Sequence, residues 1–181
     1  PAAIEALGAG LKDAKIREEA RRALTRITNE RATTALIAAL DEVDEPFQAA
    51  IIDGLGEKRD ASAVVALLER TAAVDQAVRQ ATWRALARIA SPHALNAFTS
   101  AVQDKKDPYV TELLLDYAEA LLDAGNLAEA DTVLRLRKEA GSQTIVEQCR
   151  MLRAHARIAT PESISPILSG LDETDLKIRG A

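Results

Sequence analysis

The sequence predicts an all-α protein, a right-handed α-solenoid (alpha-alpha superhelix) of about five helical hairpins plus a truncated sixth. Hydrophobic residues make up 48% of the chain but aromatic residues only 3%, and small aliphatic side chains suit closely packed helices. Apolar positions recur with the 3.6-residue period of helices and do not alternate as they would in strands. The pattern itself repeats every 31 to 35 residues, which is typical of stacked supersecondary units.

Each repeat is marked by an aspartate and, three residues later, by the first apolar residue of a helix. Six registers agree in position and mostly in residue type, which indicates that one structural unit is repeated. The first apolar residues are Ile16, Phe47, Val78, Val110, Ile145 and Ile178. The residues three places earlier are Asp13, Asp44, Asp75, Asp107, Ser142 and Asp175.

Each repeat contains two helical patterns, named here the A helix and the B helix. Ser91-Pro92 and Asp107-Pro108 place an N-cap acceptor before a proline, which has no amide to leave unpaired in the first turn. Gly141 supplies the positive φ that ends a helix. The expected A helices are 1–11, 30–41, 60–71, 92–103, 127–139 and 161–171. The expected B helices are 14–27, 46–57, 76–90, 108–124 and 142–159, with a stump from 175.

No linker divides the chain, so the sequence predicts one solenoid domain over residues 1–181. The chain begins in the middle of the repeat pattern. From its first apolar residue, the sixth B helix continues for only four residues, 178–181. We therefore expect a fragment of a longer protein. Solenoids need polar capping repeats for solubility, and neither end resembles one, so end-to-end self-association is expected at high concentration.

An aspartate, then Val/Ile-Arg, then Ala-Leu and Ile, in hairpins of this length, resembles the HEAT repeat. The resemblance is strongest to the short bacterial kind also found in phycobilin lyases, and it covers essentially the whole chain. One hairpin, 114–134, with the turn Gly125-Asn126-Leu127, is similar to the tetratricopeptide repeat. The resemblance implies that the aspartate caps the B helix and that the following arginine contacts an aspartate of the neighbouring repeat. The residues of this ladder are Asp13, Arg17, Asp44, Asp75, Arg79, Asp107, Asp175 and Arg179.

The sequence contains no constellation that indicates catalysis. His93 and His155 are two repeats apart, and Cys149 is near only the second, so no cluster has metal-ligand spacing. Phosphate-binding loops and nucleophile motifs are also missing. We therefore predict no enzyme, no catalytic residue, no metal site and no cofactor. No apolar run reaches the roughly 20 residues of a membrane span, so no membrane partner is expected.

Composition argues against nucleic acid as the partner. The net charge is −5 and the pI is about 5.2, whereas phosphate binding needs clustered positive charge. Arginines do recur on the B helices, but acidic residues occupy the same register in other repeats: Arg22, Asp53, Arg84 and Asp116 alternate in sign. This alternation interrupts any phosphate track.

The Trp83 register is the position five residues after the first apolar residue, and it reads Arg21, Ile52, Trp83, Leu115 and Arg150. Helical geometry places it on the flank of the B helix, about 110° from the centre of the apolar stripe. One interpretation is packing between adjacent B helices. The other is a partly exposed groove anchored by Trp83, because aromatic residues in desolvated places dominate interface energies.

We accordingly predict a non-enzymatic protein–protein interaction scaffold that uses the concave B-helix face. The expected partner is a protein or peptide with apolar anchors and basic flanks. The predicted partner-binding residues are Ile52, Trp83, Leu115, Arg84, Gln80 and Glu112. Two alternatives stay open: a bilin lyase or isomerase subunit, which rests on the resemblance alone, and, ranked below it, a HEAT-like nucleic-acid-binding protein.

Overall fold

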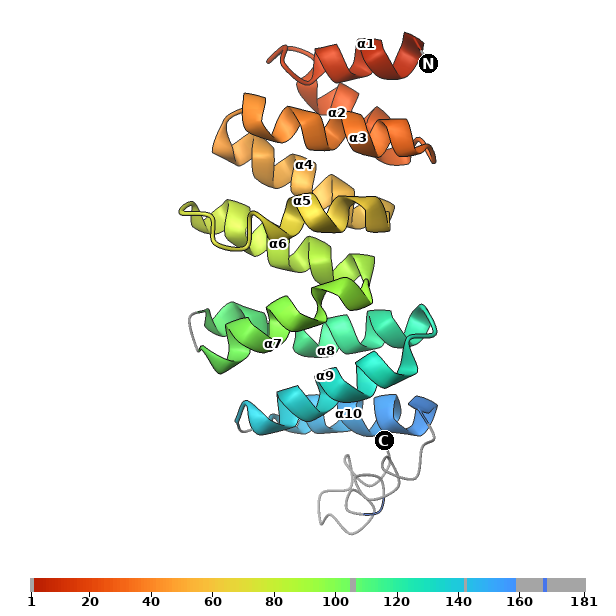
Figure 1. Ribbon diagram of the computed structural model, residues 1–181, viewed down its shortest axis with the longest axis vertical. Coiled ribbons are helices and arrows are strands. Elements are labelled where there is room, and N and C mark those ends of the chain that lie inside the picture. The colour runs from red at the N-terminus through yellow and green to blue at the C-terminus, as the bar shows by residue number, and fades with distance from the viewer. Residues whose placement is uncertain (1, 105–106, 142, 159–167, 169–181) are drawn as a thin grey trace. The chain divides into compact units, whose positions relative to one another are not determined.

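The computed structural model describes residues 2–104, 107–141, 143–158 and 168, and over these residues the chain is helical and contains no β-strand (Figure 1). The all-α prediction is confirmed. Contacts divide the chain into two compact units, Pro1–Ala94 and Leu95–Ala181. Apart from residue 168, the predicted hairpin of 161–171 with its stump from 175 lies outside the described residues, as do the ladder residues Asp175 and Arg179.

The first unit contains three hairpins, each an A helix followed by a B helix. The A helices are α1 (Ala2–Gly10), α3 (Glu30–Ala39, continued by the 3-10 turn η1, Leu40–Glu42) and α5 (Val64–Leu68, preceded by η2, Ala61–Ala63). The B helices are α2 (Arg17–Arg26), α4 (Glu45–Lys58) and α6 (Gln76–Ile89). The B helix α4 contacts both α2 and α6, so the hairpins of this unit stack through their B helices.

The second unit continues the same alternation. After η3 (Pro92–Ala94), which ends the first unit, come the A helix α7 (Leu95–Gln103), the B helix α8 (Pro108–Asp123), the A helix α9 (Leu127–Glu139) and the B helix α10 (Ile145–Ile158). Helix α8 contacts α10, and α7 contacts α9. At the centre of this unit Phe98 and Tyr117 are fully buried and stacked, with ring centroids 4.4 Å apart.

Aspartates start most of the B helices, as the repeat pattern predicts. The Asp44 carboxylate accepts a hydrogen bond from Phe47 N at 3.1 Å, and Asp75 accepts from Val78 N at 2.8 Å. Asp107 accepts from Tyr109 N at 3.1 Å. Asp13 differs, because it accepts from Lys15 N at 2.9 Å inside a turn, so α2 begins at Arg17 and not at the predicted residue 14.

Further helices are also shorter than the sequence suggested, among them α5 and α10. The A helix expected over 60–71 has only five α-helical residues, because i→i+3 bonds such as Arg70 N to Leu67 O close its end. The B helix expected from 142 begins at Ile145. Its start is fixed by a capping box, in which Thr144 N donates to Glu147 Oε2 at 2.8 Å and Glu147 N donates to Thr144 Oγ1 at 3.3 Å.

Helix α4 approaches its neighbours closely because it carries two buried glycines. A Cβ at Gly56 would lie 2.8 Å from Ala85 Cα on α6, and a Cβ at Gly54 would lie 2.6 Å from Thr25 Oγ1 on α2. At Gly56 the close atom belongs to the backbone, so a larger residue would require movement of α6, whereas at Gly54 it belongs to the side chain of Thr25. Glycine weakens a helix interior, and here the close helix packing offsets that cost.

A lysine links α4 to α2 at a position where the other repeats carry an apolar residue. Lys58 has the register of Ile27 and Ile89. Its Nζ donates to Ile27 O at 2.5 Å and to Leu24 O at 3.4 Å. These are carbonyls at the C-terminus of α2, where the last helical carbonyls have no intrahelical donor, and Ile27 O also accepts from Asn29 N at 3.0 Å. Desolvation by burial lowers the pKa of Lys58.

Candidate partner-binding surface

The apolar members of the Trp83 register are buried. Ile52, Trp83 and Leu115 are exposed by only 0%, 4% and 2%. The expectation that part of this row stays exposed is therefore wrong. The small residues beside this row serve helix packing, since Gly56 lies against Ala85 and Ala87 is itself buried. At such close helix separation the flank of a B helix is covered by its neighbour.

The accessible face of the B helices is polar. In the first unit Gln80 and Arg84 of α6 are half-buried, and Arg88, one turn further along, is exposed. In the second unit Glu112 of α8 is exposed. The structure thus makes accessible the three polar residues of the predicted site, Gln80, Arg84 and Glu112, and encloses the three apolar ones.

Neighbouring B helices carry opposite charge. In the first unit α4 has three carboxylates and one lysine, whereas α6 has three arginines and no carboxylate. In the second unit α8 has four carboxylates and no basic residue, whereas α10 has three arginines and one glutamate. The alternation of sign seen along the sequence is therefore an alternation between helices that pack side by side.

These opposite charges form ion pairs between the helices. Arg84 of α6 donates to both carboxylate oxygens of Asp53 on α4, at 3.0 Å each. Arg150 of α10 donates to Asp116 at 2.6 Å and to Glu119 at 2.8 Å on α8. The hydrogen bond to Glu119 is the main reason that the pKa of Arg150 is raised. The ion pairs hold adjacent hairpins together and neutralise part of the exposed face.

In helix α2 two arginines pair with a carboxylate of the same helix. Arg21 donates to Glu18 at 2.7 and 2.9 Å, and Arg22 donates to the same carboxylate at 2.9 Å. The hydrogen bond from Arg21 is the largest cause that lowers the pKa of Glu18 to about 2. The Trp83 register is thus charged at Arg21 and Arg150 and apolar at the three positions between them.

At the first repeat, the residue after the first apolar position makes the inter-repeat contact that was predicted for the ladder. Arg17 Nη1 lies 3.0 Å from Asp44 Oδ2, and its guanidinium lies 4.5 Å from the centre of the Phe47 ring. This hydrogen bond is the main cause that lowers the pKa of Asp44. At the third repeat Arg79 donates to Ala73 O at 2.6 Å and Val74 O at 3.3 Å.

Two family models match this sequence, and both describe HEAT repeats. The HEAT repeats model matches residues 33–118, and the PBS lyase HEAT-like repeat model matches residues 16–42. Together they run over 16–118, more than half of the chain, and the helical hairpins agree with them. This chain is a HEAT-repeat protein. No curated protein matches it.

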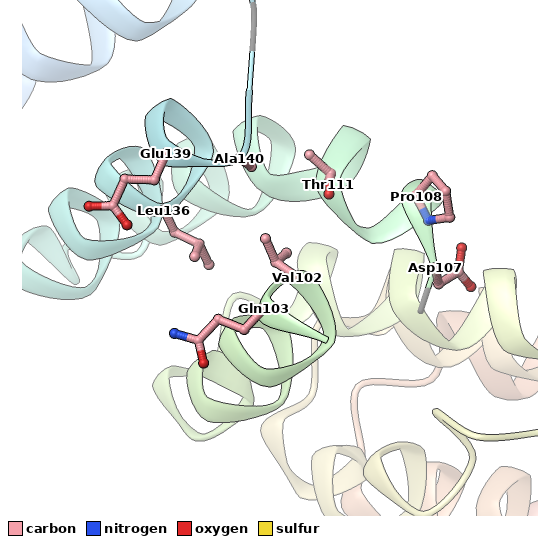
Figure 2. Close-up of a pocket in the computed structure, with 8 residues that line it drawn as sticks. All are labelled: Val102, Gln103, Asp107, Pro108, Thr111, Leu136, Glu139 and Ala140. Atoms are coloured by element: carbon pink, nitrogen blue, oxygen red, sulfur yellow. The ribbon is translucent and has the colours of Figure 1, made fainter. Parts of the chain in front are cut away.

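The second unit of this HEAT-repeat protein contains a pocket of about 510 Å³. It lies between the C-terminal ends of the A helices α7 and α9 and the N-terminal end of the B helix α8 (Figure 2). Its lining residues are Val102, Gln103, Asp107, Pro108, Thr111, Leu136, Glu139 and Ala140. Sequence reasoning missed this pocket, although Thr111 is a short residue in a register of mostly long ones.

The histidines and the cysteine of the HEAT repeats are packed or isolated. His155 is buried, and its Nδ1 lies 2.7 Å from Met151 O one turn earlier. Cys149 is buried on the core side of α10. Among the described residues no three His, Cys, Asp or Glu side chains are grouped as a metal site. None of the described helices is both long and apolar enough to cross a membrane.

Proposed function

We propose that this HEAT-repeat protein is a non-enzymatic scaffold for protein–protein interaction, and that the partner contacts the charged face of its B helices. The proposal rests on the charged side chains of this face that take no part in the inter-helix ion pairs. Arg26, Glu57 and Arg88 share one register at the ends of α2, α4 and α6 and are exposed. Within the part of the chain that the structure describes, no ion pair involves any of the three.

The burial of the apolar row changes the kind of partner that fits. Apolar anchors have no accessible receiving surface at Ile52, Trp83 and Leu115. A polar partner remains suitable, and α8 with its exposed Glu112 and Asp116 favours basic residues in it. We therefore retain the basic flanks of the expected partner and not its apolar anchors.

The test is affinity capture with the purified chain as bait, followed by calorimetry with the captured protein. The B-face variant is Glu57→Lys with Glu112→Lys, because a basic partner is repelled by the reversed charge. The control is Glu5→Lys on the A helix α1, which is also exposed and changes charge in the same way at one position. The proposal expects binding at least about tenfold weaker for the B-face variant, which is about 1.4 kcal/mol, and unchanged for the control. Equal affinity for both proteins would refute it.

The match of residues 16–42 to the PBS lyase HEAT-like repeat supports a second candidate, a bilin lyase or isomerase subunit. This candidate expects a tetrapyrrole to bind, so that the protein mixed with a bilin shows a changed visible absorbance spectrum. An unchanged spectrum would leave the scaffold as the proposed function.

A further inference from the structure

The pocket of the second unit combines an apolar floor with an acidic rim. Val102 and Leu136 are nearly buried, at 8% and 9% exposure, and they face each other across the pocket (Figure 2). Asp107 and Glu139 lie on opposite sides of it (Figure 2). The eight lining residues include these two carboxylates and no basic residue. A cation with an apolar stem therefore matches the lining in charge and in polarity.

The register of the HEAT repeats explains why there is space here. The residue after the first apolar position is Arg17, Gln48 and Arg79 in the first three repeats. Each of these long side chains lies against the start of a B helix, where Gln48 Nε2, for example, donates to Val43 O at 3.4 Å. The fourth repeat has Thr111 in the same position. Threonine is too short to reach the adjoining A-helix ends.

Asp107 brings a carboxylate to the rim through its capping role, in which its Oδ1 accepts the Tyr109 amide at 3.1 Å. A carboxylate can accept from several donors at once. Glu139 is exposed at the last turn of α9. The amide oxygen of Gln103, at the end of α7, adds an uncharged acceptor to the lining.

We propose that this pocket binds an arginine side chain of the protein partner, in the place that a long side chain at position 111 would otherwise occupy. The methylene stem packs on Val102 and Leu136, and the guanidinium donates to the carboxylates of the rim. Arginine fits better than lysine because its planar guanidinium has five donors and is more weakly hydrated. This inference rests on the proposed scaffold function, since it assigns the basic character of the partner to one pocket.

The direct test is an NMR titration of the isotope-labelled chain with N-acetyl-arginine amide. N-acetyl-citrulline amide, which has nearly the same shape and no charge, is the matched ligand control. We expect amide shifts at 107–111 and 136–140 with arginine, a Kd on the order of 1 mM for so small a ligand, and at least tenfold weaker binding of citrulline. Equal binding of the two ligands, or shifts confined to other helices, would overturn the inference.

Three variants make the test specific to the pocket. Thr111→Arg supplies the missing side chain in the chain itself and is expected to abolish binding. Asp107→Asn with Glu139→Gln removes the charge but keeps an N-cap residue, and it is expected to weaken binding at least tenfold. Glu69→Gln removes an exposed carboxylate of the first unit, away from the pocket lining, and it is expected to leave binding within a factor of two. Unchanged binding in the first two variants would overturn the proposal.

Lys105 and Lys106 precede Asp107 in the sequence, so the titration is repeated with both replaced by serine. Binding that appears only in this variant would also refute the inference, because the pocket would then be filled from its own chain. Failure of the pocket is separable from failure of the scaffold function. Loss of partner binding on Glu57→Lys with Glu112→Lys, together with no arginine binding, would refute only the pocket.

Discussion

The Trp83 register is apolar at one helix interface and ionic at another. Between α4 and α6 it contributes Ile52 and Trp83, both buried, and Gly56 brings the two helices close together. Between α8 and α10 it contributes buried Leu115 and the charged Arg150, which extends to carboxylates on α8. One position in the repeat therefore serves the same stacking of B helices through two different interactions.

The two interfaces should tolerate different kinds of substitution. Close-packed apolar side chains are sensitive to changes of volume and are not subject to charge screening, whereas partly exposed ion pairs contribute little and are screened by salt. The α4–α6 interface should therefore respond strongly to changes of side-chain size. The α8–α10 interface should respond weakly, and mainly to charge.

The largest expected effect is at Trp83. Trp83→Ala should lower the free energy of unfolding by about 3–5 kcal/mol, as for other buried aromatic side chains. For a chain of this length that corresponds to a fall in Tm of roughly 2–4 °C per kcal/mol. The control is Gln80→Ala, a half-buried position on the same helix, with an expected change within about 0.5 kcal/mol. Thermal melts in which both variants lower Tm by the same amount would show that Trp83 contributes no apolar packing between α4 and α6.

Gly56→Ala should have the next largest effect, about 1–3 kcal/mol of destabilisation by overpacking. The added Cβ would lie 2.8 Å from the backbone of α6, which cannot move aside as a flexible side chain could. Gly8→Ala in α1 is the matched control, because its Cβ would meet only Ala35 Cβ at an ordinary 3.6 Å. Chemical denaturation should show the control to be neutral or stabilised, and a stabilised Gly56→Ala would contradict the close approach.

Arg150→Met should cost about 1 kcal/mol or less at low salt, since the side chain is 31% exposed and its pairs are partly solvated. The cost should fall toward zero at about 1 M salt, where the screening length is about 3 Å. Melting curves of wild type and variant at both salt concentrations measure this directly. A large loss of stability that is independent of salt would show that Arg150 behaves like a buried residue and that the two interfaces do not differ.

The smallest effect is a pH dependence from Glu18, which pairs with the α2 member of the Trp83 register, Arg21. The folded-state pKa of Glu18 is lowered to about 2, from 4.5. Its contribution to stability is therefore present above pH 4.5 and is lost as the pH falls toward 2. Glu18→Gln should remove a small part of the fall in Tm over this range. An identical pH profile for both proteins would show that the pairing contributes nothing.

Much of the fold could be predicted from interactions between residues that are close together in the sequence. Asp44, Asp75 and Asp107 cap B helices because a carboxylate before a helical pattern pairs the amides of the first turn. The apolar period and the Ser91-Pro92 and Asp107-Pro108 starts locate the hairpins. These features depend on residues near in sequence, so no knowledge of the packing is needed to recognise them.

The candidate surface depends on distances between helices, which the sequence does not reveal. The helical angle of Trp83 is compatible with a groove and with an interface, and Gly56 decides between them only once Ala85 is known to oppose it. Lys58 likewise occupies an apolar register, and its role is clear only from the carbonyls of α2 that it reaches. The capping box of Thr144 and Glu147 was visible in the sequence, but the aspartate register obscured it.

The central claim is that the apolar part of the Trp83 register is enclosed in the packing between B helices. Trp83 is the single tryptophan of the chain, so its fluorescence reports this position without background. The decisive measurement is quenching of the native protein by acrylamide and iodide, compared with the chain unfolded in denaturant. The account predicts blue-shifted native emission that is little quenched, and full quenching only after unfolding. Native emission that is as red-shifted and as easily quenched as that of the unfolded chain would contradict it.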